Sequence, residues 1–276
     1  MRETAYTTEI DAWHAERVAG LRSETGWLTL SGLHRLTPGT YSLGAAAEND
    51  IVLPGAATPR TGVLTVTSDG VEFAAEGGAP VAIRGDGNGA PIGTVTMRSD
   101  AGGPPTILTS GNASLQVIER GGELFLRTKD RDSATLREFN GIDRFPVDPR
   151  WRVTATLIPE PGATLAITNV LGQIETSPCP GALEFVLDGQ THRLRPTVNS
   201  DGSLFFVFGD TTNGRQTYGA GRFLDADPIG DDGSVELDFN KAHNPICSMS
   251  AFATCPLPPA GNRLPIAVEA GERYSR

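Results

Sequence analysis

The densest group of reactive and hydrogen-bonding side chains in this chain lies between residues 235 and 272, which we call the C-terminal cassette. This stretch holds two of the three cysteines, one histidine, three asparagines and five prolines. Long connections inside compact domains are usually functional when they are ordered, and proline favours order because its ring fixes φ. We therefore expect the functional site of the chain to include this cassette.

The two cysteines of the cassette, Cys247 and Cys255, allow several interpretations. They could bind zinc together with His243 and Asp238, which is a weak candidate because their spacing matches no known zinc knuckle. Cys247 could be a nucleophile with His243 as its base, or the pair could form a disulfide, which a reducing cytosol disfavours. We favour the fourth interpretation, in which both are small buried side chains that pack the loop. We expect no cofactor and no metal beyond this weak zinc candidate.

A second group of polar residues follows predicted strands of the C-terminal half. If these strands are neighbours, the group converges; its members are Asp210, Tyr218, Arg222, Asp238, Asn240, Asn262 and Arg263. Functional residues commonly lie at strand ends and on loops that a rigid scaffold holds. The arginines could bind a carboxylate or phosphate in a bidentate manner, and a buried aspartate could act as a general base.

These residues give the site that the sequence predicts. We predict catalytic roles for Asp210, Asp238, Arg222 and Arg263, and ligand-binding roles for Tyr218, Asn240, Asn244 and Asn262. A competing interpretation is that the charged side chains pair with each other inside the protein and cap turns. Two functions follow: an enzyme that acts on a small polar or anionic molecule by acid/base or hydrolytic chemistry, or a non-catalytic module that binds a small ligand or a protein.

Short β-favouring segments, separated by turn residues, must position these side chains. The segments recur at spacings of roughly 8 to 12 residues, which favours antiparallel meanders or a sandwich over βαβ units. They include WLTL (27–30), GVLTVT (62–67) and ELFLRT (123–128), and in the C-terminal half WRVTATLI, TLAITNV, QIETS, LEFVL, THRLRP, LFFVF and VELDF. The 33 glycines and 20 prolines are in keeping with many turns. One segment reads as a helix, roughly residues 9–24, with Thr8 as its N-cap and Gly26 as its stop.

The sequence therefore predicts an all-β protein of two packed antiparallel lobes, sandwich-like or barrel-like, with one N-terminal α-helix. We expect the helix within residues 1–26, an N-terminal β lobe over 27–140, and a C-terminal β lobe over 141–276 that carries the cassette. The boundary near residue 140 is soft, because two β layers that share one core would give the same pattern.

Charge and hydropathy restrict the partners. The formal net charge is −10 and the sequence pI is about 4.9, which disfavours nucleic acid and anionic membranes because both are bound through clustered Lys and Arg. No window approaches the roughly 18 apolar residues of a spanning helix. We expect a soluble cytoplasmic protein with a small-molecule ligand; the sequence predicts no oligomeric state.

Four blocks carry a resemblance to a known family: GWLTLSGLHRLTPGTYSLG, GIDRFPVDPRWRVTA, DTTNGRQTYGAGRFL and the cassette itself. They resemble successive blocks of the bacterial and archaeal domain-of-unknown-function family sixteen eighty-four, from about Ala15 to Glu272. The family has no established activity, so the resemblance implies a shared fold unit and no mechanism. His243 stands where the family typically has Tyr, and Ile246 where a second Pro is common. A metal site that depends on His243 would therefore not be a family feature.

A fainter resemblance lies in residues 41–62, YSLGAAAENDIVLPGAATPRTG, which look like the opening of a forkhead-associated phosphopeptide-binding sandwich. Such modules carry an arginine after the glycine and a Ser-x-x-His turn. Here Ala45 follows Gly44, and residues 58–61 include no histidine. Because the contact residues are absent, we expect a β-sandwich lobe with this turn geometry and no phosphopeptide site.

Overall fold

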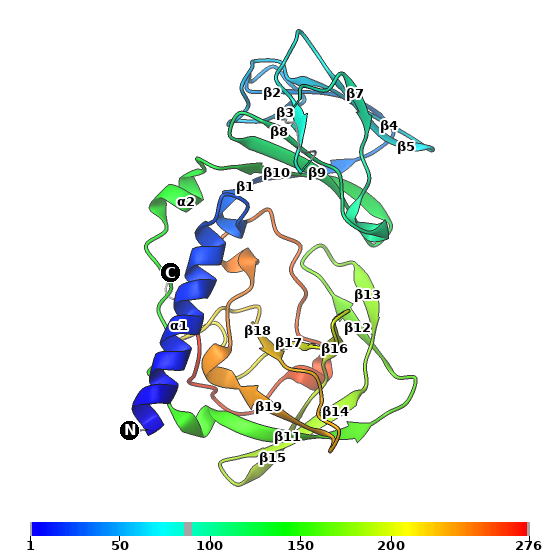
Figure 1. The fold of residues 1–276 in the computed structure, drawn as a ribbon. Coiled ribbons are helices and arrows are strands. Elements are labelled where there is room, and N and C mark those ends of the chain that lie inside the picture. Colours follow the sequence, from blue (N-terminus) through cyan, green and yellow to red (C-terminus); the bar gives the residue numbers. More distant parts are fainter. Residues whose placement is uncertain (1, 86–89, 275–276) are drawn as a thin grey trace. The chain divides into compact units, whose positions relative to one another are not determined.

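The computed structural model describes residues 2–85 and 90–274 (Figure 1). The chain divides into two compact units. The C-terminal unit comprises the residues up to 19, residues 140–249 and the residues from 254 on; the N-terminal unit comprises residues 20–139 and 250–253. Most of the N-terminal helix thus belongs to the C-terminal unit.

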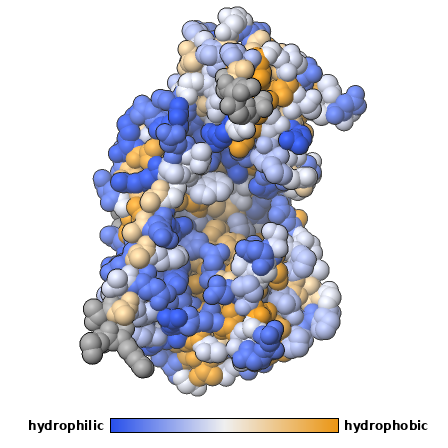
Figure 2. All heavy atoms as spheres, in the orientation of Figure 1, coloured by the Kyte–Doolittle hydropathy of each residue, from blue (hydrophilic) through white to orange (hydrophobic). Residues whose placement is uncertain are grey.

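The N-terminal helix, α1, spans Arg2–Arg22 and begins seven residues before the predicted start. Thr8 consequently lies inside the helix, and the prediction that it is the N-cap is wrong. The additional turns are held by a tertiary contact, because the hydroxyl of Tyr6 donates to both carboxylate oxygens of Asp238 at 2.8 Å. Tertiary contacts of this kind routinely outweigh local propensity. Hydrophilic residues predominate along the outer face of α1 (Figure 2).

The N-terminal unit contains two five-stranded sheets. In the first, the strand order is β1–β10–β9–β8–β6; the strands span Leu30–Leu36, Glu123–Asp130, Ala113–Arg120, Ile107–Ser110 and Ala82–Ile83. In the second, the order is β3–β2–β4–β5–β7; the strands span Ile51–Val52, Gly39–Gly44, Gly62–Thr67, Gly70–Ala75 and Thr94–Thr96. Neighbouring strands are antiparallel except β2 and β3, which are parallel. Alternate side chains, such as Leu64 and Phe73, point into one apolar core.

The C-terminal unit is built from shorter sheets around a second apolar core. Its four-stranded sheet has the order β15–β14–β11–β19, over Gln190–Leu194, Gly181–Leu187, Arg152–Pro159 and Ser234–Asp238. Its three-stranded sheet has the order β16–β17–β18, over Thr197–Val198, Leu204–Phe208 and Arg222–Ala226. A hairpin pairs β12 and β13, which span Thr164–Thr168 and Ile174–Pro178.

The remaining helices are short. They are α2 (Ala134–Glu138) and the 3₁₀ turns η1 (Trp27–Thr29), η2 (Asp100–Gly102), η3 (Pro149–Trp151), η4 (Phe239–Lys241), η5 (Ile246–Ser248) and η6 (Ala260–Asn262). Residues 27–29, which we predicted to be extended, form η1 instead, and the first strand starts at Leu30. None of the described helices combines the length and the apolar character that crossing a bilayer requires.

The all-β prediction is confirmed, because antiparallel sheets dominate both units and α1 is the long helix of the described residues. The predicted segments do not include β18, which begins at Arg222 directly after a glycine-rich stretch and pairs with β17. This pairing places Phe208 opposite Arg222. The end of β17 and the start of β18 therefore meet at the place where several predicted site residues lie.

Candidate functional site

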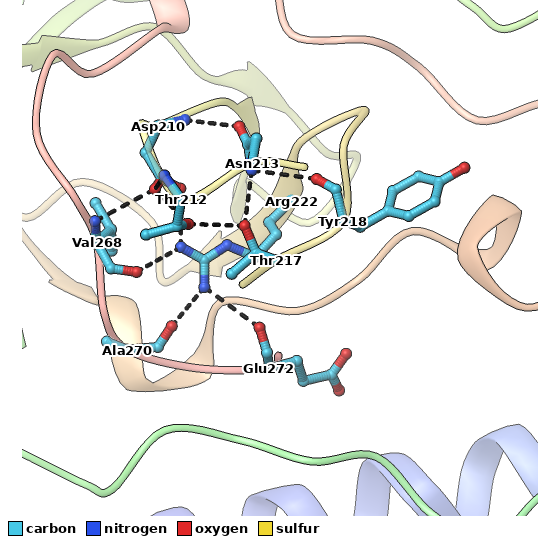
Figure 3. Close-up of polar contacts among 9 residues, drawn as sticks. All are labelled: Asp210, Thr212, Asn213, Thr217, Tyr218, Arg222, Val268, Ala270 and Glu272. Atoms are coloured by element: carbon cyan, nitrogen blue, oxygen red, sulfur yellow. Dashed lines mark hydrogen bonds and ion pairs between the residues drawn. The ribbon is translucent and has the colours of Figure 1, made fainter. Parts of the chain in front are cut away.

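Asp210 and Arg222 form a buried ion pair beside the paired ends of β17 and β18 (Figure 3). Neither side chain has exposed surface, and Nη2 of Arg222 donates to Oδ2 of Asp210 over 2.9 Å. The guanidinium also donates to the carbonyl groups of Val268, Ala270 and Glu272. Burial lowers the pKa of Arg222, and the negative charges of Asp210 and Glu272 oppose that shift. The protein itself therefore supplies the hydrogen-bond acceptors of the Arg222 guanidinium.

The other oxygen of Asp210 organises the loop that follows β17. Oδ1 accepts from the backbone N–H and the hydroxyl of Thr212 and from the N–H of Val268. The hydroxyl groups of Thr212 and Thr217 lie 2.7 Å apart, and the amide of Asn213 donates to Thr217 and to the carbonyl of Tyr218. The ring of Tyr218 points away from this network (Figure 3). Asp210 and Arg222 thus lie together, as predicted. They pair with each other inside the protein, as in the interpretation that competes with a ligand site.

Asp238 and Asn240 belong to a second group, centred on Tyr6. The amide of Asn240 donates to the Tyr6 hydroxyl at 2.9 Å and to the carbonyl of Asp148 at 3.0 Å, and it accepts from the N–H of Asp148. Burial and the hydrogen bond to Asp238 raise the pKa of the Tyr6 hydroxyl. The guanidinium of Arg152 lies 5.2 Å from the centre of the Tyr6 ring. Tyr6 is absent from the predicted site, because its partner is 232 residues away in the sequence.

Asn244 lies in a third group, with a buried carboxylate that the predicted site did not include. Glu272 is buried, and its carboxylate accepts from the guanidinium of Arg17 in α1 and from the N–H of Asn244 at 2.7 Å. Arg17 also donates to the carbonyl of Asn244 at 2.9 Å. Two residues from opposite ends of the chain therefore hold α1 against the C-terminal cassette.

Asn262 and Arg263 differ in exposure although they are neighbours. Asn262 is fully buried, and its amide exchanges hydrogen bonds with the backbone of Arg195 and donates to the carbonyl of Val207. Arg263 is exposed. A Cβ placed on Gly209 would lie 3.0 Å from Nη1 of Arg263, so the guanidinium covers that glycine. Asn262 fixes the start of the last segment and leaves Arg263 at the surface.

All three cysteines are thiols, and Cys247 and Cys255 lie together. The ring of His243 packs against two other rings: its centre is 6.2 Å from that of Trp13 and 5.9 Å from that of Phe223. Burial lowers the pKa of His243 to about 3. Among residues 2–85 and 90–274, no three His, Cys, Asp or Glu side chains are grouped to hold a metal ion. The weak zinc candidate of Cys247, Cys255 and His243 is thus not assembled.

A group of cations around Trp27 in the N-terminal unit was not foreseen. The guanidinium of Arg127 lies 5.3 Å, and Nζ of Lys129 lies 5.2 Å, from the centre of the Trp27 ring. Nζ of Lys129 donates to the carbonyl of Thr25. The indole is 41% exposed, whereas Arg127 is only 5% exposed. Burial, followed by the positive charges of Arg127 and Arg84, lowers the pKa of Lys129 to about 8. We call Trp27, Arg127 and Lys129 the cation–indole cluster.

The alternation of a strand could have revealed this cluster. Successive side chains of a strand point to opposite faces, so residues 127 and 129 share a face of β10. Our predicted strand stopped at Thr128, whereas β10 continues to Asp130 because Ser114 and Ala113 of β9 pair with its last two residues. The predicted strand therefore leaves Lys129 outside the sheet, between Thr128 and the polar segment that begins at Asp130.

Fold and buried polar groups together define an all-β protein whose C-terminal unit is organised by internal ion pairs. A family described as "Protein of unknown function (DUF1684)" matches residues 137–273. A solution NMR structure of an uncharacterized protein from Haloarcula marismortui is 34% identical, over 50% of this chain and 78% of that chain, with a TM-score of 0.41. No curated protein matches the chain. The chain belongs to the DUF1684 family.

Proposed function

We propose that this protein binds a small anionic molecule and that the cation–indole cluster is its binding site. The observation that carries the proposal is the placement of two cations beside one partly exposed indole. Clustered cations repel one another, and the depressed pKa of Lys129 reflects this repulsion together with burial. A carboxylate or phosphate bound there would relieve the repulsion and would accept charge-assisted hydrogen bonds.

The chemistry of the cluster favours a particular kind of ligand. The indole ring offers an apolar surface of 41% exposure, on which a planar or aliphatic group can pack. The half-buried ammonium of Lys129 is a point charge that a ligand can contact, and the guanidinium of Arg127, which is buried, adds to the positive charge of the cluster. The ligand that suits both parts is a small organic acid or a phosphate ester. The net charge of −10 agrees with this choice, because the protein as a whole repels long polyanions.

We favour binding over catalysis because of the state of the predicted catalytic residues. Asp210 and Arg222 bind each other and backbone groups, and Asp238 accepts from the Tyr6 hydroxyl with both of its carboxylate oxygens. A catalytic acid or base must reach the reacting atoms of a substrate. Of the four predicted catalytic residues, Arg263 has an exposed side chain, and an arginine alone is suited to binding anions and not to general base catalysis.

Calorimetric titration with citrate and with sulfate tests the proposal. We expect the wild-type protein to bind at least one of these anions, and Lys129→Met to weaken that binding by about tenfold, because one charge-assisted contact is lost. The matched control is Arg60→Met, which removes a cation from the loop before β4; the Arg60 side chain is 59% exposed and paired with Glu76. Wild-type affinity in the control supports the proposal. Absence of binding to the wild-type protein, or equal affinities of Lys129→Met and wild type, would overturn it.

The affinity for sulfate should depend on pH through Lys129. Its pKa in the unliganded protein is about 8, and only the protonated amine attracts an anion, so affinity should fall as pH rises through this value. Between about pH 7 and pH 9 the protonated fraction falls roughly tenfold, and the association constant should follow it. Sulfate keeps its charge over this range. Lys129→Arg, which stays protonated, should give a nearly flat profile; a profile as steep as that of the wild type would assign the titration to another group.

A further inference from the structure

Cys247 and Cys255 stand at the two ends of a short loop, residues 248–254. The backbone N–H of Cys247 donates to Sγ of Cys255 over 3.2 Å, and the two thiols also share a hydrogen bond. Both backbones are anchored, since the carbonyl of Cys247 accepts from the hydroxyl of Tyr218 and that of Cys255 accepts from the N–H of Val170. The sulfur atoms are therefore held near each other by the surrounding structure.

The two thiols differ in exposure and in acidity. Cys247 is half-buried, whereas Cys255 is 8% exposed. The hydrogen bond from Cys255 lowers the pKa of Cys247 to about 7, and the same bond together with burial raises the pKa of Cys255. A thiolate is the nucleophile in thiol–disulfide exchange, and one that is accessible and has a pKa near ambient pH reacts fastest. The pair has the asymmetry of an attacking thiol and a resolving thiol.

We propose that Cys247 and Cys255 form a redox-active pair that is oxidised to a disulfide by small-molecule disulfides. The thiolate of Cys247 attacks one sulfur of the oxidant, the S–S bond of the oxidant breaks, and one thiolate leaves. Cys255 then loses its proton to solvent and attacks Sγ of Cys247, which releases the second thiolate. Two protein thiols are thereby oxidised to one disulfide, and the small disulfide is reduced to two thiols.

The position of the pair gives the reaction a structural consequence. Residues 250–253, inside the loop, belong to the N-terminal unit, whereas Cys247 and Cys255 belong to the C-terminal unit. A disulfide would close the loop at the points where the chain leaves and re-enters the C-terminal unit. Closure of a loop restricts the conformations of its residues, so the redox state of the pair would set how freely residues 248–254 move.

Exposure of the wild-type protein to glutathione disulfide, followed by peptide mass spectrometry, tests the proposal. We expect a Cys247–Cys255 disulfide and an unmodified Cys179, which is 4% exposed and donates to the carbonyl of Gly181. In the reduced protein, iodoacetamide should alkylate Cys247 about tenfold faster than Cys179, with a rate that rises through a midpoint near the pKa of about 7. These measurements need no variant. Glutathione disulfide that leaves both thiols unmodified would overturn the proposal.

Variants separate the two roles. Cys255→Ser should accumulate a stable mixed disulfide between glutathione and Cys247, because no resolving thiol remains. Cys247→Ser should leave Cys255 unmodified, and the control Cys179→Ser should form the disulfide as the wild type does. Circular dichroism tests whether each variant is folded. If a variant is unfolded, the glutathione disulfide experiment on the wild-type protein decides the proposal. Modification of Cys255 in Cys247→Ser at the wild-type rate would contradict the assignment of Cys247 as the attacking thiol.

Discussion

Asp210→Ala is expected to lower the free energy of unfolding by about 3–5 kcal/mol, because it leaves the charge of a buried guanidinium without its counter-charge. Arg222 has no exposed surface, so water cannot replace the lost carboxylate without local rearrangement. The variant also removes the acceptor of the Thr212 hydroxyl and N–H. Urea unfolding near neutral pH, followed by circular dichroism, measures the loss.

Two comparisons identify the ion pair as the cause. Asp210→Leu combined with Arg222→Met removes both charges, so the double variant should lose less stability than Asp210→Ala alone. Glu184→Ala breaks an exposed ion pair with Arg193 in the same unit, and it should cost less than about 1 kcal/mol. If Asp210→Ala destabilises the protein no more than Glu184→Ala does, the buried ion pair is not a main support of this unit.

Arg17→Met is expected to lower the free energy of unfolding by about 3 kcal/mol, because it leaves the buried carboxylate of Glu272 without its counter-charge. The side chain of Glu272 is 1% exposed, and that of Arg17 is 15% exposed. The N–H of Asn244 would still donate to the carboxylate. Because Arg17 lies in α1, hydrogen exchange of the α1 amides should accelerate in the variant, and chemical unfolding gives the magnitude.

The matched control for this prediction is Lys241→Met. Lys241 pairs at 3.0 Å with Glu9, which lies in α1 as Arg17 does, but both side chains of this pair are partly exposed. Loss of this ion pair should therefore lower the free energy of unfolding by less than about 1 kcal/mol. A double variant, Arg17→Met with Glu272→Gln, should recover part of the stability because no buried charge remains. Equal losses in Arg17→Met and Lys241→Met would show that the link between α1 and Glu272 contributes little.

Much of the fold could be predicted from local patterns. Segments such as GVLTVT and LFFVF became strands β4 and β17, because alternating or continuous apolar residues between turn residues have few other ways to be buried. The start of α1 could not be predicted, since its first turns depend on the contact between Tyr6 and Asp238 across most of the chain. Strand β18 was missed because glycines precede it and its partner strand alone defines it.

The candidate site was predictable in position more than in chemistry. The polar residues near β17 and β18 do meet, because antiparallel pairing brings Asp210 and Arg222 to adjacent ends. Whether two opposite charges serve a ligand or each other depends on burial, and side-chain burial is a property of the packed structure that spacing does not encode. The acidity of Cys247 likewise depends on a hydrogen bond from a residue eight positions away.

The ion pair between Arg17 and Glu272 joins residues that are 255 positions apart. During synthesis, Arg17 of α1 emerges from the ribosome 255 residues before Glu272, its buried partner. Residues 20–139 can form their two sheets in the interval, since they and residues 250–253 make up a unit of their own. The helix therefore lacks this buried partner, and its interior face stays uncovered, until residue 272 has been made. Contacts of such long sequence separation form slowly, and incomplete chains expose apolar surface meanwhile. The nascent chain would thus depend most on chaperones in this period.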